Sequence, residues 1–299
     1  MKKEKIFAIK GIMILCLAFL SAGFFLIGFS NLITATASQK TEKILNTLPP
    51  LIAPSPQPEL NQFSEYTNWR VLGIVVRHVN VTLPNGTNVQ ISMSQRDIRI
   101  ATTRFNDMAN TLNILANGQM NVDLTIIVIE TPLTTVMPIQ TTMGTIGYAP
   151  SSRMLHALVQ NYVNPDDFDH VMFFLRTQLT GVPSVPTAWS GLYQGMIGNA
   201  HFSQVIFGPN ANCTWHDNAV FPERILVHEF IHGLERHARI RGIEIPSSID
   251  ANRANYGYGT SQAEHLRFYR DYLNQNIQMP DGRLIGLTPP AFITNRASN

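Results

Sequence analysis

Apolar and often β-branched residues predominate over 71–83. Asn85 and Gly86 follow, and over 89–93 apolar and polar residues alternate with the two-residue period of a β-strand. Asn-Gly pairs favour tight hairpin turns, because both residues accept the left-handed backbone conformation. The pattern therefore predicts a β-hairpin over 71–93.

A spacing of three and four residues replaces this alternation after residue 94. Ser94 and Asp97 have the spacing of a helix capping box, and Gly118 is a typical stop signal. The apolar positions of one helix face lie between them: Ile98, Ala101, Phe105, Met108, Leu112 and Leu115. A long amphipathic helix is predicted here.

Two nearly continuous apolar runs, 122–129 and 170–176, predict strands that are buried on both faces. Residues 202–207 predict another strand, which we expect at an edge of the sheet because Pro209 stops it. Helices are expected at 154–163 and 261–277. The order of elements predicts an α+β fold in which a long helix backs a mixed sheet.

The N-terminal part has a different composition. Four lysines precede an uncharged apolar run over 11–33, and residues 35–37 offer an Ala-Thr-Ala cleavage site. This order predicts a secretory signal over 1–37, and the run is also long enough to remain as a signal anchor. Proline-punctuated residues 38–66 predict an extended linker. The folded domain is then expected over 67–299.

Either form of the signal places the rest of the chain outside the cytoplasmic membrane of a bacterium, secreted or anchored at its outer face. The whole chain carries +2, and residues 1–37 hold four Lys and one Glu, or +3, so the exported part carries about −1. This charge argues against a nucleic-acid partner and restricts membrane contact to the N-terminal segment. Cys213 alone follows the signal, so no internal disulfide can form. The protein is expected to be a monomer.

The sequence His228-Glu229-Phe230-Ile231-His232 carries the candidate chemistry. Residues four apart lie on one face of a helix, so both imidazoles can bind one zinc ion. Glu229 lies about 100° around the helix and can reach a water molecule without being a ligand. Glu235 shares the polar stripe, either as a partner of His232 or as an ordinary surface charge.

This motif, following a sheet and a long helix, resembles the zincin metallopeptidases over roughly residues 69–275. The resemblance implies a zincin-like mixed sheet with a backing helix, an active-site helix and a C-terminal helix. It also implies that His228 and His232 bind Zn²⁺ and that Glu229 is the general base. The expected partner is a protein or peptide substrate, cleaved by an exported zinc-dependent metalloendopeptidase.

The family's third ligand is less clear in this chain. Metzincins have a third His six residues after the second, but Ala238 stands there and His237 comes one residue early. We therefore exclude a metzincin and expect His237 to be structural or on the surface.

Four downstream residues remain candidates for the third ligand: Asp250, Glu264, Glu244 and His265. Asp250 resembles the aspzincin ligand, an Asp shortly before a Tyr-Gly pair, although Tyr256-Gly257 follows after six residues instead of three. Glu264 would match a gluzincin, but it also forms a capping box with Ser261. We adopt Asp250 as the predicted ligand.

Tyr256 is a candidate donor to the oxyanion of the reaction, as is Tyr258, unless this aromatic loop simply packs on the last helix. Cys213 is expected to be a small buried apolar residue, with a zinc-blocking thiolate or an intermolecular disulfide as the alternatives. Two other functions fit the same residues: a surface binding module on a peptidase-like fold that has lost catalysis, and a zinc amidase acting on cell-wall peptide.

Overall fold

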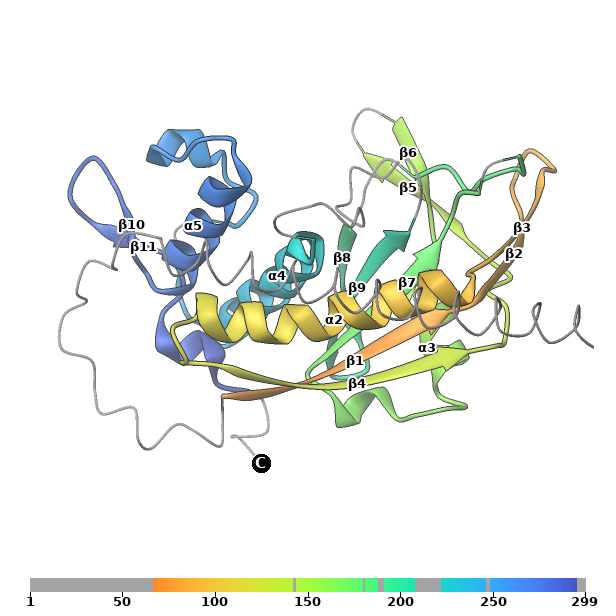
Figure 1. Ribbon diagram of the computed structural model, residues 1–299, viewed down its shortest axis with the longest axis horizontal. Helices are drawn as coiled ribbons and strands as arrows, with labels where there is room; N and C mark the ends of the chain where they lie inside the picture. Colours follow the sequence, from red (N-terminus) through yellow and green to blue (C-terminus); the bar gives the residue numbers. More distant parts are fainter. Residues whose placement is uncertain are drawn as a thin grey trace, which may run out of the picture.

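A computed structural model of the chain is shown in Figure 1. It describes residues 67–141, 144–179, 181–187, 191–207, 222–245 and 248–294. The predicted signal, the linker and Cys213 lie outside these residues. Within the described ranges, no helix combines the length and the apolar character needed to cross a bilayer.

A five-stranded mixed sheet forms the centre of the molecule and confirms the predicted α+β class (Figure 1). Its strands, in spatial order, are β4 (Asn121–Ile129), β1 (Asn68–Val76), β7 (His170–Arg176), β9 (Ala200–Phe207) and β8 (Gly191–Ile197). The first four run parallel to their neighbours, whereas β8 runs antiparallel to β9.

Helices cover one face of this sheet, where one of the two hydrophobic cores lies. They are α2 (Gln95–Leu115), α4 (Arg224–Ile240) and α5 (Gln262–Leu273). Ser94 caps α2 in the predicted capping box. In β1, Val71 and Val75 face these helices, whereas the alternate residues Leu72 and Ile74 belong to the core on the opposite face. This two-residue alternation shows why β1 is apolar along its length.

The opposite face is covered by smaller elements. A hairpin of β2 (His78–Thr82) and β3 (Asn88–Ser92) lies there with α3 (Ser152–Val159). The hairpin turns at Asn85 and Gly86, as predicted, with Gly86 at φ +82°. The predicted first strand, 71–83, is in fact divided between β1 and β2, so only its second half belongs to the hairpin.

Two predictions about strand positions were wrong. Residues 202–207 form the interior strand β9, and β8 is the edge strand beside it. β8 escaped prediction because its two glycines, Gly191 and Gly195, are poor strand formers. The strand at 122–129 is not buried on both faces, since β4 is the other edge of the sheet and Val128 is 38% exposed.

The remaining elements are short. They are the hairpins β5 (Met137–Thr141) with β6 (Gly144–Ala149) and β10 (Ile277–Gln278) with β11 (Leu284–Ile285), and the 3₁₀ turns η2 (Pro165–Asp167), η3 (Arg253–Tyr256) and η4 (Pro289–Phe292). Helix α3 begins two residues before its predicted start and ends four residues early, and α5 ends four residues early. Figure 1 shows α5 and the β10–β11 hairpin together at one end of the sheet, beyond α4.

Candidate metal centre

Helix α4 carries the His-Glu-x-x-His residues and packs against strands β8 and β9. Its N-cap residue is Glu223, whose side chain makes no capping hydrogen bond. Gly233 allows the close approach of the helix to the sheet. A Cβ atom there would lie 2.5 Å from Nδ1 of His170 on β7, nearer than non-bonded atoms can approach.

His228, His232 and Asp250 come together although Asp250 lies eighteen positions after His232 in the chain. Nε2 of His228 is 3.2 Å from Oδ1 of Asp250, and Nε2 of His232 is 3.4 Å from Oδ2. Among the described residues, this is the group of His, Cys, Asp and Glu side chains whose ligand atoms lie close enough to share a metal ion, all within 4.8 Å of one another.

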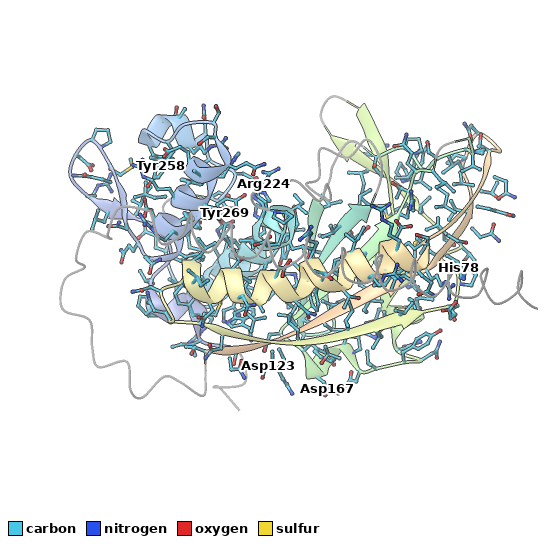
Figure 2. The ribbon with its side chains drawn as sticks, viewed as in Figure 1. His78, Asp123, Asp167, Arg224, Tyr258 and Tyr269 are labelled. Atoms are coloured by element: carbon cyan, nitrogen blue, oxygen red, sulfur yellow. The ribbon has the colours of Figure 1, made fainter. Side chains whose placement is uncertain are left out.

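The Nδ1 atoms of both imidazoles have partners of their own. Nδ1 of His228 lies 2.9 Å from the hydroxyl of Tyr269 on α5, and Nδ1 of His232 lies 3.3 Å from Oε2 of Glu235. The Tyr269 hydroxyl also accepts a hydrogen bond from Arg224, and Figure 2 shows both residues near the start of α4. The Glu235 carboxylate favours a proton on Nδ1 of His232, which leaves Nε2 of that ring free to bind a metal ion. The Tyr269 hydroxyl is able to accept or to donate at Nδ1 of His228 and fixes the orientation of that ring.

The charges of the three groups are coupled. Hydrogen bonds from His228 and His232 hold the pKa of Asp250 far below its usual value, so this carboxylate is ionised. Burial by itself would lower the pKa of His232, but hydrogen bonds to Asp250 and Glu235 outweigh it and raise that pKa to about 10. An ionised carboxylate facing two imidazole nitrogens is a donor set that suits Zn²⁺.

Glu229 lies beside this group and is 3% exposed. Burial raises the pKa of its carboxyl group to about 8, while the nearby His232 lowers it and Asp250 raises it. The backbone N–H of Tyr193, on β8, donates a hydrogen bond to the carboxyl group. A Cβ atom on Gly191 would lie 2.4 Å from Oε1 of Glu229, so the glycine of β8 makes room for this side chain.

Other residues that the sequence suggested as ligands have different partners. The carboxylate of Glu264 accepts hydrogen bonds from the N–H of Gly259 and from Arg267, and its backbone N–H donates to the Ser261 side chain. Only this last half of the predicted capping box is formed. His237 donates to the carbonyl oxygen of Ile293 over 2.6 Å and is structural, as predicted. These assignments leave Asp250 as the third member of the group.

The remaining suggested residues lie as follows. Glu244 is exposed just after α4. The His265 ring lies 6.4 Å from that of Tyr269, and burial lowers the pKa of His265 to about 4. The rings of Tyr256 and Tyr258 pack on Phe268 of α5, which confirms the packing alternative for this loop.

The partners of the imidazoles could not be selected from the sequence. Tyr269 was visible there only as an apolar position of the last helix, and nothing in its spacing relates it to His228. For Glu235 one indication was present in the sequence, since this residue shares a helix face with His232. Both roles depend on how α5 and the loop at 248–250 pack against α4.

A second set of histidines lies under α4 and is buried in the sheet. A hydrogen bond of 2.9 Å joins Nε2 of His170 to the Ser203 hydroxyl, and one of 3.0 Å joins Nδ1 of His201 to the Tyr193 hydroxyl. Burial holds the pKa of His170 well below its usual value and lowers that of His201 to about 3. Both imidazoles are therefore neutral in the folded protein near neutral pH.

We expect these two histidines to make the fold sensitive to acid. In the unfolded chain each binds a proton below about pH 6.5, whereas in the folded protein His201 does so only near pH 3. The unfolded state binds more protons in this window, so stability is fully present above pH 6.5 and falls as the pH falls. Each should contribute a slope of about 1.4 kcal/mol per pH unit.

Urea unfolding between pH 7.5 and 4.5 would measure this slope. His201→Gln should reduce this slope by about 1.4 kcal/mol per pH unit. His156→Gln, on the partly exposed helix α3, should leave the slope unchanged. Equal slopes in the wild-type protein and the His201 variant would contradict the expectation.

Comparisons with known proteins add no identification. No protein-family model matches the chain, and no curated protein is significantly similar to it in sequence. The residues themselves therefore carry the functional argument. Two imidazoles, one carboxylate and a neighbouring buried Glu are together able to bind a divalent cation and to transfer a proton beside it.

Proposed function

We propose that the protein is a zinc-dependent metalloendopeptidase that acts outside the cytoplasmic membrane. The observation that carries this proposal is the approach of His228, His232 and Asp250 around one point, with Glu229 beside it. Three protein ligands and an open position are the composition of a catalytic zinc site, whereas a structural site has four protein ligands. The basic and apolar N-terminal pattern supports export.

The fold supports the same proposal. A mixed sheet, a long helix that packs on it and the His-Glu-x-x-His helix agree with what the resemblance to zincins implies. Strand β8 is an edge of this sheet, and α4 packs against it. The third ligand, Asp250, favours an aspzincin-like site over a gluzincin-like one.

Zn²⁺ held by His228, His232 and Asp250 would supply Lewis acidity and lower the pKa of a water molecule to about 7. Glu229 would accept the proton of the attacking water and deliver it to the leaving amine. Its position suits this task, because the backbone N–H of Tyr193 fixes the carboxyl group and Gly191 leaves space for it.

The same strand offers a way to bind an extended substrate. β8 ends the sheet on the side of the metal centre, so a peptide could pair with its main chain. The ring of Tyr193 on β8 lies 6.2 Å from that of His232, which places this strand next to the candidate ligands. A peptide bond held along β8 would then lie near Glu229.

Metal analysis and peptide digestion test the proposal together. The purified protein should contain about one zinc ion per chain and should cleave members of a peptide library. A chelator should abolish the cleavage, and added Zn²⁺ should restore it. His228→Ala should bind no zinc and cleave nothing. Wild-type protein that binds no zinc, or that cleaves equally well with the chelator present, would refute the assignment.

A further inference from the structure

Glu235 is a buried carboxylate next to the candidate metal ligands but is not one of them. It lies on α4, three residues after His232, and is 1% exposed. Oε2 lies 3.3 Å from Nδ1 of His232 and accepts a hydrogen bond from the Ser248 hydroxyl over 3.3 Å. Oε1 accepts hydrogen bonds from the N–H of Ile249 over 2.6 Å and from the Tyr272 hydroxyl over 2.5 Å.

These partners belong to three separate parts of the chain. His232 is on α4, Ser248 and Ile249 precede the third ligand directly, and Tyr272 is on α5. The side chain of Asp250 is 67% exposed, so its own burial holds it in place only weakly. The anchored backbone of Ile249 next to it therefore determines where the Asp250 carboxylate lies.

We propose that Glu235 is a positioning residue that assembles the metal centre from its two halves. It orients the ring of His232 and holds the loop that brings Asp250 to the imidazoles. This inference rests on the proposed function, because it concerns the same metal site. It goes further by naming the group on which the third ligand depends.

Replacement by glutamine tests the role because the side chain keeps its size. Both oxygens of Glu235 face donors: the Ile249 N–H on one side and His232 Nδ1 on the other. A carboxamide has one oxygen and one NH₂ group, so it can satisfy only one of these sides. Glu235→Gln therefore either releases the Asp250 loop or presents an N–H to Nδ1 of His232, which favours a proton on the metal-binding Nε2.

We expect Glu235→Gln to weaken Zn²⁺ binding about 10- to 100-fold, as loss of such partners does in other metal sites. Competition with a chromogenic chelator would measure the affinity. Asp271→Asn is the matched control, since Asp271 is also a buried carboxylate, 4% exposed, but accepts from Tyr258 in the loop before α5 and from Arg270 on α5. It should bind Zn²⁺ within about threefold of the wild-type protein.

A second pair of variants covers the case in which Glu235→Gln does not fold. Tyr272→Phe removes one donor to Glu235 and should weaken Zn²⁺ binding roughly fivefold, as expected for one hydrogen bond. Tyr258→Phe removes the corresponding donor to Asp271 and should leave the affinity unchanged. Thermal unfolding without added metal identifies any variant whose fold is lost.

The absorption spectrum of the Co²⁺-substituted protein separates positioning from general stability, because it responds to the geometry of the ligands. Glu235→Gln should shift its visible bands, whereas Asp271→Asn should not. Unchanged affinity and spectrum in Glu235→Gln, or equal losses in Asp271→Asn, would overturn the inference. If the wild-type protein itself binds no Zn²⁺, or if His228→Ala binds it equally well, the proposed function fails instead, and the positioning role fails with it.

Discussion

Glu229→Gln should reduce peptide hydrolysis by about three orders of magnitude while leaving zinc binding intact. Removal of a general base typically costs 10²- to 10⁴-fold in rate, because the attacking water must then lose its proton without help. Glutamine has nearly the same size, and it can still accept the hydrogen bond from the Tyr193 backbone N–H. It cannot take up a proton, however.

Zinc content and steady-state hydrolysis of one peptide found in the library digestion would check this expectation. The effect should appear in kcat, since the proposed role of Glu229 is on the reacting atoms and not in substrate binding. Glu264→Gln is the control, because that carboxylate pairs with Gly259 and Arg267 instead. A Glu229→Gln protein that keeps more than a tenth of the wild-type rate would rule out Glu229 as the base.

Asp250→Ala should weaken zinc binding about 100- to 1,000-fold and abolish cleavage at low zinc concentration. If about 12 kcal/mol of zinc affinity is divided among four ligands, each protein ligand contributes about 3 kcal/mol. The folded state should change little, because the Asp250 side chain is 67% exposed. The loss should therefore appear in metal affinity and not in thermal stability without metal.

The same measurement on Glu264→Ala and His265→Ala compares Asp250 with the other candidates. Both variants should retain zinc affinity within about threefold, since neither residue belongs to the group around His228 and His232. Wild-type affinity in Asp250→Ala, together with loss of zinc in one of the other two, would move the third ligand to that residue.

Together these variants separate three tasks in one small region. Asp250 would hold the metal, Glu229 would transfer the proton, and Glu235 would keep the two halves of the site together. Changes at Asp250 and Glu235 should alter zinc affinity, and only the change at Glu229 should alter the rate at saturating zinc. A binding module without catalysis would show the zinc effects but no hydrolysis to lose.

Local patterns predicted several elements accurately. The capping box at Ser94 and the apolar spacing after it predicted α2, and the continuous apolar run at 170–176 predicted β7 to the residue. These predictions succeeded because helix caps and hydrophobic periodicity are properties of residues close together in the chain. The His-Glu-x-x-His spacing is also a pattern of residues close together in the chain.

Strand order was harder to predict. The sequence placed 202–207 at the edge of the sheet and gave no signal for β8, whose glycines are unfavourable in strands. Pairing between strands is decided by contacts across the sheet, and a strand's own residues do not specify its neighbour. The edge strand beside the metal centre was consequently identified only from the structure.

For this protein the sequence by itself determined that one helix carries the two imidazoles on one face, with Glu229 next to them. These positions depend only on the periodicity of a helix over a few residues. Tertiary structure alone brought Asp250, and not Glu264, next to the two imidazoles. It also revealed Tyr269, Tyr272 and the carboxylate of Glu235 as partners. These groups meet through the packing of α5 and the 248–250 loop on α4. Such contacts join residues up to 41 positions apart, and no local pattern specifies them.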